Sequence, residues 1–362
     1  MKSHFFNLLR FSLSEDFHFS SVLTAEEWAE VYVIAQQQTL GGVLFAGLER
    51  LSAEQRPPRS ILLKWFAMTE RIKQANRLLN KRAVEASEYF FKEGFSNCIL
   101  KGQGVAAYYP NPLLRMSGDV DIWLSGGHEC IHNFARERVG LQGITYHHVH
   151  YPLFDDVEIE VHITPGYLSN PWLNNKLQRY FKDSFSEQAS NYVTLPDAVG
   201  SIPRPKVEFD LVFLLLHMYK HLIGQGIGLR QMMDYYYVLQ QPIDDGVRGR
   251  VVARLKEFKV LRFAHATMFV MSEVFGLEEK YLLVGPDEKA GRFLLDEIMQ
   301  AGNFGKYDAR LERRHNETAW FRLVRSLKRN VRFLRYYPNE VFWNPIFRTW
   351  QYIWRLRKKT SA

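Results

Sequence analysis

The sequence has few of the features that would set it apart from ordinary globular proteins of a reducing compartment. Only two cysteines, Cys98 and Cys130, occur among its 362 residues, which is too few for a disulfide framework. No apolar run approaches the length that crosses a membrane, and residues 1–21 lack the basic start, apolar block and small-residue cleavage site of a signal peptide. These absences predict a cytoplasmic chain without a membrane span.

The composition is that of a folded chain of enzyme size. Hydrophobic residues make up 46% of the sequence, enough for a substantial core over about two or three domains. The formal net charge of +8 comes largely from two helix-like stretches, 318–337 and 341–359, that are also rich in aromatic residues. Such stretches can bind nucleic acid, anionic lipid or nucleotide. Solvated cations on ordinary packed helices are the simpler interpretation.

The order of the predicted elements favours an α+β fold with a small mixed sheet between two helical regions. Residues 1–95 are helical in pattern, with a helix start at Thr24 and a long periodic segment over 60–94. An α/β core is expected over 96–205, ending in a loop at 197–205, and a helical domain over 206–362. Helical regions on both sides of a sheet form a cleft, which is where ligands usually bind.

The most informative pattern is a pair of aspartates inside a predicted strand. Asp119 and Asp121 are two residues apart, so a strand directs both carboxylates to one face, while Val120 and Ile122 face the core. Like charges held this close are costly unless a cation or water screens them. Mg²⁺ takes oxygen ligands, typically from one or two carboxylates. The pair therefore indicates a magnesium site, with a solvated strand end as the alternative.

A second predicted strand, 157–163, alternates strictly and places Glu158, Glu160 and His162 on one face. Either glutamate can supply a third acid, and the sequence favours a solvent-facing position for Glu158. A helix is expected near 129–138 and a further strand within 144–154. Upstream, a short strand at 97–100 runs into a predicted flexible loop, 101–104, where Lys101 and backbone N–H groups can approach phosphates.

These motifs together resemble a known group of enzymes. They are Leu100-Lys101-Gly102, Tyr108-Tyr109-Pro110, Arg115, Gly118-Asp119-Val120-Asp121 and Glu160-Val161-His162. The combination resembles the nucleotidyltransferase superfamily whose prototype is DNA polymerase beta and is similar, more narrowly, to a family of uncharacterised nucleotidyltransferases. The sequence departs from the superfamily at its turn, where Gly102-Gln103 replaces Gly-Ser, and the distance to Asp119 is longer than usual.

The resemblance implies transfer of a nucleoside monophosphate from an NTP to a hydroxyl acceptor with release of pyrophosphate. It also implies that Asp119, Asp121 and Glu160 are catalytic residues holding two Mg²⁺ ions, with His162 as an orienting hydrogen-bond partner. The acceptor is left open, with a small molecule favoured and RNA or a protein side chain possible. The implied nucleotide contacts lie around the two turns, at Lys101, Gly102, Arg115 and Gly118.

A second set of polar residues lies further along the chain. His217 and His221 share one face of an apolar helix, either at the edge of the core or, as the resemblance favours, facing the nucleotide. A zinc-peptidase motif is excluded because Met218 stands where that motif has glutamate. Arg230 either forms a surface pair with Asp234 or reaches the phosphates or base. His147, His148 and His150 are interpreted as residues of a loosely exposed strand.

Two other classes of function are compatible with parts of the pattern. Asp-x-Asp also holds the diphosphate of a nucleotide-sugar in metal-dependent glycosyltransferases, but those folds need several βα units before the motif. A non-catalytic nucleotide-binding or nucleic-acid-binding protein is the other alternative, because a fold does not fix an activity.

Overall fold

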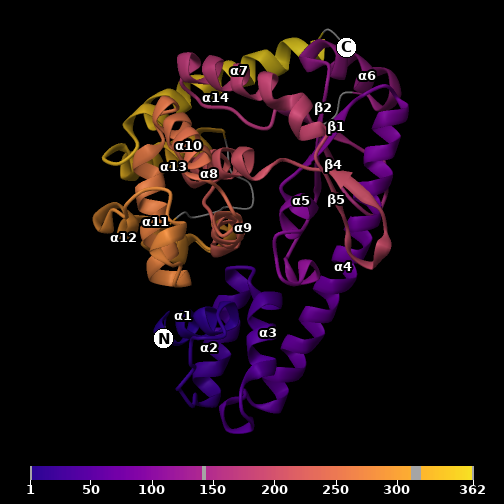
Figure 1. Cartoon of the computed structure of the whole chain (residues 1–362). Coiled ribbons are helices and arrows are strands. Elements are labelled where there is room, and N and C mark those ends of the chain that lie inside the picture. The colour runs from indigo at the N-terminus through magenta and orange to yellow at the C-terminus, as the bar shows by residue number, and fades with distance from the viewer. Residues whose placement is uncertain (1, 141–143, 311–318, 361–362) are drawn as a thin grey trace.

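A computed structural model describes residues 2–140, 144–310 and 319–360 of the chain (Figure 1). The N-terminal region is helical, as predicted. Thr24 caps its second helix in a reciprocal capping box with Glu27, which is the sequence signal that marked the helix start. The long periodic segment forms one 34-residue helix. The helices of this region are α1 (Lys2–Leu13), α2 (Ala25–Gln37), α3 (Gly41–Arg50) and α4 (Arg59–Lys92).

The central sheet has four strands in the order β1-β2-β4-β3. The inner pair, β2 and β4, is parallel, while β1 and β3 join the two edges antiparallel. The sheet is therefore mixed, and the fold is α+β. The strands are β1 (Asn97–Leu100), β2 (Val120–Leu124), β3 (His148–Tyr151) and β4 (Ile159–His162), and the helices between them are α5 (Gly102–Ala106) and α6 (Gly127–Val139).

The two faces of this sheet have different surroundings. One face is almost entirely apolar and packs against α4 and α6, where Val120, Ile122 and Val161 are at most 1% exposed. Its polar exception is Asn97 at the end of β1, which hydrogen-bonds to Ser87 on α4. On the other face, Trp123 stacks on Phe209, with ring centroids 5.8 Å apart, and joins the core of the C-terminal helices. Both faces of β2 are therefore buried. Because side chains alternate along a strand, Asp121 lies on the same face as Trp123.

Two local predictions are wrong. The segment after β1 is the short buried helix α5 and not a flexible loop, since Gln103 donates a hydrogen bond to Asn80 Oδ1 on α4 at 2.7 Å. The expected loop at 197–205 contains strand β6 (Ser201–Pro203), which pairs with β5 (Tyr192–Thr194) in a separate hairpin. Strands of three residues are too short to produce a readable alternation.

The C-terminal half is helical, and α8 and α9 form one wall of a cavity on the polar side of the sheet. Helices α1, α2 and α3 share a single apolar core with the C-terminal helices. Helix α14 then returns along the molecule to α6, where Trp354 packs beside His132 (Figure 1). The helices are α7 (Pro171–Ala189), α8 (Val207–Gly224), α9 (Leu229–Leu239), α10 (Asp245–Glu257), α11 (Leu261–Phe275), α12 (Glu288–Ala301), α13 (Ala319–Leu334) and α14 (Pro338–Thr360).

Among the described residues, no helix combines the length and the apolar character needed to cross a membrane.

Candidate active site

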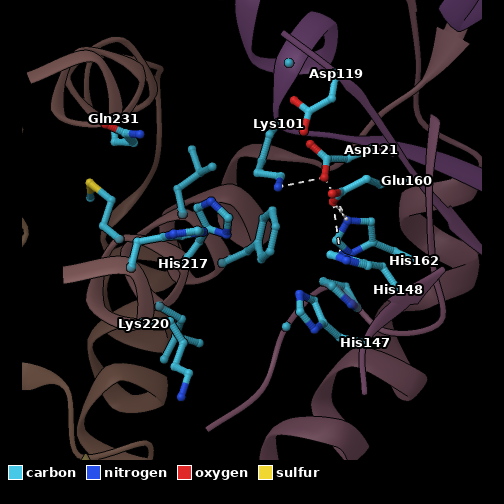
Figure 2. Close-up of a pocket in the computed structure, with 18 of the residues that line it drawn as sticks. Lys101, Asp119, Asp121, His147, His148, Glu160, His162, His217, Lys220 and Gln231 are labelled. Carbon is cyan, nitrogen blue, oxygen red and sulfur yellow. Dashed lines mark hydrogen bonds and ion pairs between the residues drawn. The ribbon is translucent and has the colours of Figure 1, made fainter. Parts of the chain in front are cut away.

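A cavity of about 550 Å³ lies between the polar face of the sheet and helices α8 and α9 (Figure 2). This volume falls within the range of about 300–1,000 Å³ that small-molecule sites occupy. Every position that the sequence singled out as a site residue lines it. These positions are Lys101, Gly102, Arg115, Gly118, Asp119, Asp121, Glu160, His217 and Arg230.

The acids come together because β2 and β4 are neighbouring parallel strands. Asp121 is directly opposite Glu160 in the register, and Asp119 precedes β2 by one residue. Adjacent positions in a parallel pair direct their side chains to the same face. Of the two candidate glutamates, the side chain of Glu160 is 17% exposed and lines the cavity, whereas that of Glu158 is 61% exposed.

Two basic side chains contact the inner acids. Lys101 Nζ lies 2.8 Å from Asp121 Oδ1, and His162 Nε2 lies 2.7 Å from the same oxygen and 3.5 Å from Glu160 Oε2. Burial alone would raise the pKa of Asp121, but Lys101 and His162 hold it below its ordinary value. Burial acts against the imidazolium of His162, yet the contacts with Asp121 and Glu160 raise its pKa. The two carboxylates therefore favour the protonated form of His162, which lies between them.

Asp119 is less fully compensated. The negative charge of Asp121, with burial as the second cause, raises the pKa of Asp119 above its ordinary value, although the positive charge of Lys101 opposes this shift in part. A partly compensated carboxylate beside two others is the environment that a divalent cation relieves. Mg²⁺ prefers oxygen ligands, and the carboxylates of Asp119, Asp121 and Glu160 supply them in one cavity. The residues present therefore fit this ion.

The backbone at Lys101 has an unusual conformation. Lys101 follows the last residue of β1 and has φ = +50°, a region that non-glycine residues rarely occupy, and α5 begins immediately after it. Strain of this kind persists only where the surrounding structure enforces it, and it concentrates at functional positions. Here it accompanies a Lys101 side chain that reaches the acids (Figure 2).

Arg115 is fixed by a buried ion pair with α9. Its Nε and Nη2 donate to the two oxygens of Asp234 at 2.7 and 2.8 Å, and its Nη1 donates to Ser117 Oγ at 2.6 Å. Asp234 also accepts a hydrogen bond from Tyr109. The alternative of a surface pair between Arg230 and Asp234 is therefore wrong, because Asp234 is buried and binds Arg115. Arg230 instead donates to the carbonyl oxygen of Met116.

The interpretation of three histidines as a loosely exposed strand is wrong in part. His148 and His150 do lie in a strand, and the side chain of His150 is 39% exposed, but all three histidines line the cavity and the side chain of His148 is only 13% exposed. The signal that could have placed two of them is alternation. Val149 and Tyr151 belong to the apolar core, so His148 and His150 share the opposite face, the one that carries Glu160.

The cavity wall opposite the sheet carries two further histidines, and Phe304 lies beside them. Burial lowers the pKa of His217 and brings that of His221 to about 4, and their ring centroids lie 4.3 Å apart. Both imidazoles are therefore neutral near pH 7. Phe304 contacts the ring of His221 and lies under the guanidinium of Arg230. No periodic pattern in the sequence marks Phe304, which lies in a short turn after α12.

The family model described as uncharacterised nucleotidyltransferase matches residues 24–276. The chain belongs to this family. Comparisons with curated proteins and with solved structures gave no significant match.

Proposed function

We propose that the protein is a Mg²⁺-dependent nucleotidyltransferase that moves a nucleoside monophosphate from an NTP to a hydroxyl acceptor and releases pyrophosphate. The observation that carries this proposal is the side-by-side placement of Asp121 and Glu160, with Asp119 next to them, in one cavity. Family membership supports nucleotidyl transfer in general. The metal, the direction of transfer and the residue roles are part of this proposal.

Asp119, Asp121 and Glu160 would hold the metal, whose bound charge neutralises the triphosphate and lowers the proton affinity of the acceptor hydroxyl. Nucleotidyl transfer depends mainly on positioning and charge neutralisation. Lys101 supplies a positive charge beside the acids. Arg115 uses three of its five N–H groups for Asp234 and Ser117, which leaves two for a phosphate. His162 would keep the acids oriented, because its Nε2 hydrogen-bonds to Asp121 and lies 3.5 Å from Glu160.

The rest of the cavity is suited to an anionic ligand with an aromatic part. Lys101, Arg115 and Arg230 place positive charge on its wall, and Phe304 offers a ring beside Arg230. We assign the triphosphate to the cationic part and the base to the neighbourhood of Phe304 and His221. The acceptor would then approach from the side of β3, and we propose a small hydroxylated molecule in that role.

The test follows the α-phosphate. The protein is incubated with Mg²⁺ and each NTP in turn, labelled at the α-phosphate or at the γ-phosphate, with small metabolites, RNA or protein as acceptors. Transfer of the α-label with pyrophosphate release supports the proposal. Transfer of the γ-label alone would instead indicate a kinase, and binding without any transfer would indicate a non-catalytic nucleotide-binding protein.

Matched variants make the test specific. The double variant Asp119→Asn/Asp121→Asn should lose α-label transfer, while Asp183→Asn, an exposed aspartate on α7, should keep it. A double variant as active as the parent would refute the assignment. A metal-dependent glycosyltransferase is disfavoured because β1 is the one strand that the described residues 2–119 contain before the aspartates.

A further inference from the structure

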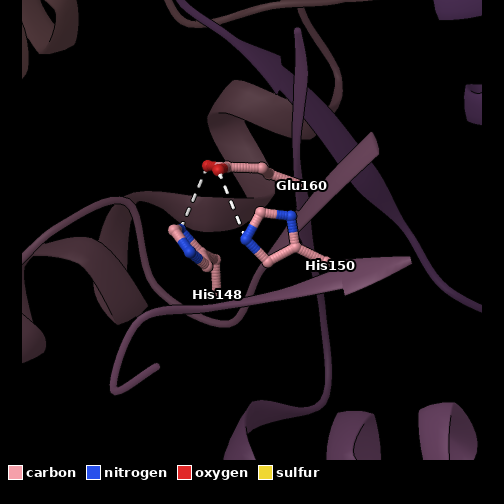
Figure 3. Close-up of side chains that lie close together, drawn as sticks. All are labelled: His148, His150 and Glu160. Atoms are coloured by element: carbon pink, nitrogen blue, oxygen red, sulfur yellow. Dashed lines mark ion pairs between the residues drawn. The ribbon is translucent and has the colours of Figure 1, made fainter. Parts of the chain in front are cut away.

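Beside the three acids, the cavity contains a second group of possible ligands. His148 and His150 on β3 lie next to Glu160 on β4, and their ligating atoms are all within 4.8 Å of one another (Figure 3). The antiparallel register pairs His150 with Glu160 and His148 with His162, which places both histidines on the cavity face of the sheet. The cluster is therefore built into two paired strands rather than into a loop.

The orientation of His150 directs its second nitrogen at a carboxylate. Its Nδ1 lies 2.5 Å from Glu158 Oε1, so in the neutral ring that binds metals the proton belongs on Nδ1 and Nε2 carries the lone pair. Nε2 faces Glu160 Oε1 at 4.0 Å. A carboxylate that fixes the far nitrogen of a histidine in this way is the usual support of a metal-binding imidazole. Glu158, although exposed, would therefore hold the ring of His150 in the orientation that metal binding needs.

The second histidine approaches the same carboxylate. His148 Nδ1 lies 3.1 Å from Glu160 Oε2, but its direction is too poor for a hydrogen bond, and the atom is otherwise buried without a partner among the described residues. Metal bonds of about 2.0–2.1 Å to nitrogen and oxygen put neighbouring ligand atoms about 3 to 3.4 Å apart. The distance of 3.1 Å between His148 Nδ1 and Glu160 Oε2 already meets this spacing. The distance of 4.0 Å between His150 Nε2 and Glu160 Oε1 would meet it after a small side-chain rotation.

We propose that His148, His150 and Glu160 form a binding site for a divalent transition-metal ion, separate from the oxygen-only site at Asp119 and Asp121. Imidazole nitrogen is a ligand for Zn²⁺, Co²⁺ and related ions, whereas Mg²⁺ prefers oxygen. Glu160 has two oxygens and can serve both sites. The protein would therefore be selective for two different kinds of cation in one cavity.

The place of this ion in the reaction rests on the proposed function. An ion held by β3 lies on the side of the cavity that we assign to the acceptor, where a bound metal lowers the proton affinity of a hydroxyl group. The existence of the site does not depend on that assignment. Metal binding can be measured without any nucleotide.

The experiment uses the full-length, metal-free protein after removal of any affinity tag that contains histidine. Co²⁺ is titrated and followed by its visible absorption, which reports nitrogen ligation, and by calorimetry. We expect one Co²⁺ to bind, with Zn²⁺ in competition and Mg²⁺ unable to displace it. His148→Gln/His150→Gln should weaken Co²⁺ binding by at least about 100-fold, and Glu158→Gln by about 10-fold, as for supporting residues of metal sites.

The controls separate the two proposals. His4→Gln removes a histidine that also lies beside a glutamate, Glu27 on α2, but far from the sheet, and should leave Co²⁺ binding unchanged. Asp119→Asn/Asp121→Asn should lose nucleotidyl transfer and keep Co²⁺ binding. If the double histidine variant, shown to be folded by its thermal melt, binds Co²⁺ as tightly as the parent, the site does not exist. Absence of α-label transfer in a parent that binds Co²⁺ would instead refute the proposed function alone.

Discussion

The two faces of the central sheet are built from the same strands but satisfy opposite requirements. On the face toward α4 and α6, Ile122 and Val161 are buried among apolar side chains, and each position stabilises the fold without special partners. On the other face, Asp121 and Glu160 are buried charges that need Lys101 and the histidines. Alternate residues of one short strand therefore serve either stability or chemistry, and substitutions on the two faces should have separable effects.

The largest expected effect is on the cavity face. Asp119→Asn should reduce nucleotidyl transfer to background, because it removes one of the proposed metal ligands. The same change should raise the free energy of unfolding of the metal-free protein at pH 7 by about 0.5–1 kcal/mol, since it removes repulsion by Asp121. Transfer of α-label and urea unfolding, measured on the same samples, check the two effects.

The size of this gain depends on pH. Because the pKa of Asp119 is raised in the folded protein, its charged form destabilises the fold at pH values above the ordinary carboxyl pKa of about 3.9. The advantage of Asp119→Asn should therefore be present at pH 7 and disappear as the pH falls below that value. A variant that is less stable than the parent at pH 7 would contradict the comparison.

The next effect concerns the ion pair that joins the cavity to α9. Asp234→Asn leaves the buried guanidinium of Arg115 without its carboxylate, and breaking a buried pair in this way costs about 3–5 kcal/mol. Glu208→Gln breaks the exposed pair with Arg250 and should cost at most about 1 kcal/mol. Equal costs in urea unfolding would show that the buried pair has no special role.

The smallest effect belongs to the apolar face. Ile122→Val removes one buried methylene and should lower the free energy of unfolding by about 0.5–1.5 kcal/mol. Nucleotidyl transfer at a temperature where the variant is folded should stay at the parent level. A loss of transfer without a loss of stability would show that the faces are not independent.

The sequence predicts those helices and strands whose apolar residues recur at a regular spacing. The long periodicity of α4, the capping box of α2 and the alternation of β2 and β4 are all local signals, and the alternation placed Asp119 and Asp121. The same alternation put Glu158 and Glu160 on one face, and only the resemblance to the nucleotidyltransferase family favoured Glu160. The strand expected within 144–154 is limited to His148–Tyr151 in the structure. A local pattern gives the type of an element more reliably than its ends.

Other parts of the site depend on contacts that the chain order hides. Arg115 and Asp234 are 119 positions apart, so their pairing depends on how α9 packs against the segment before β2. The histidines of β3 become cavity residues only because β3 joins the sheet beside β4. Phe304 reaches the cavity from a turn in the C-terminal half. Tertiary packing decides all three.

The contact between Lys101 and Asp121 has a consequence for the order of ligand binding. A tethered ammonium already occupies one oxygen of Asp121, so an arriving divalent ion must compete with a counterion that belongs to the protein. A triphosphate attracts the same ammonium and frees that oxygen. Nucleotide and metal should therefore strengthen each other's binding by the same factor, as linkage requires, and the empty protein should hold the ion more weakly than the nucleotide-loaded one.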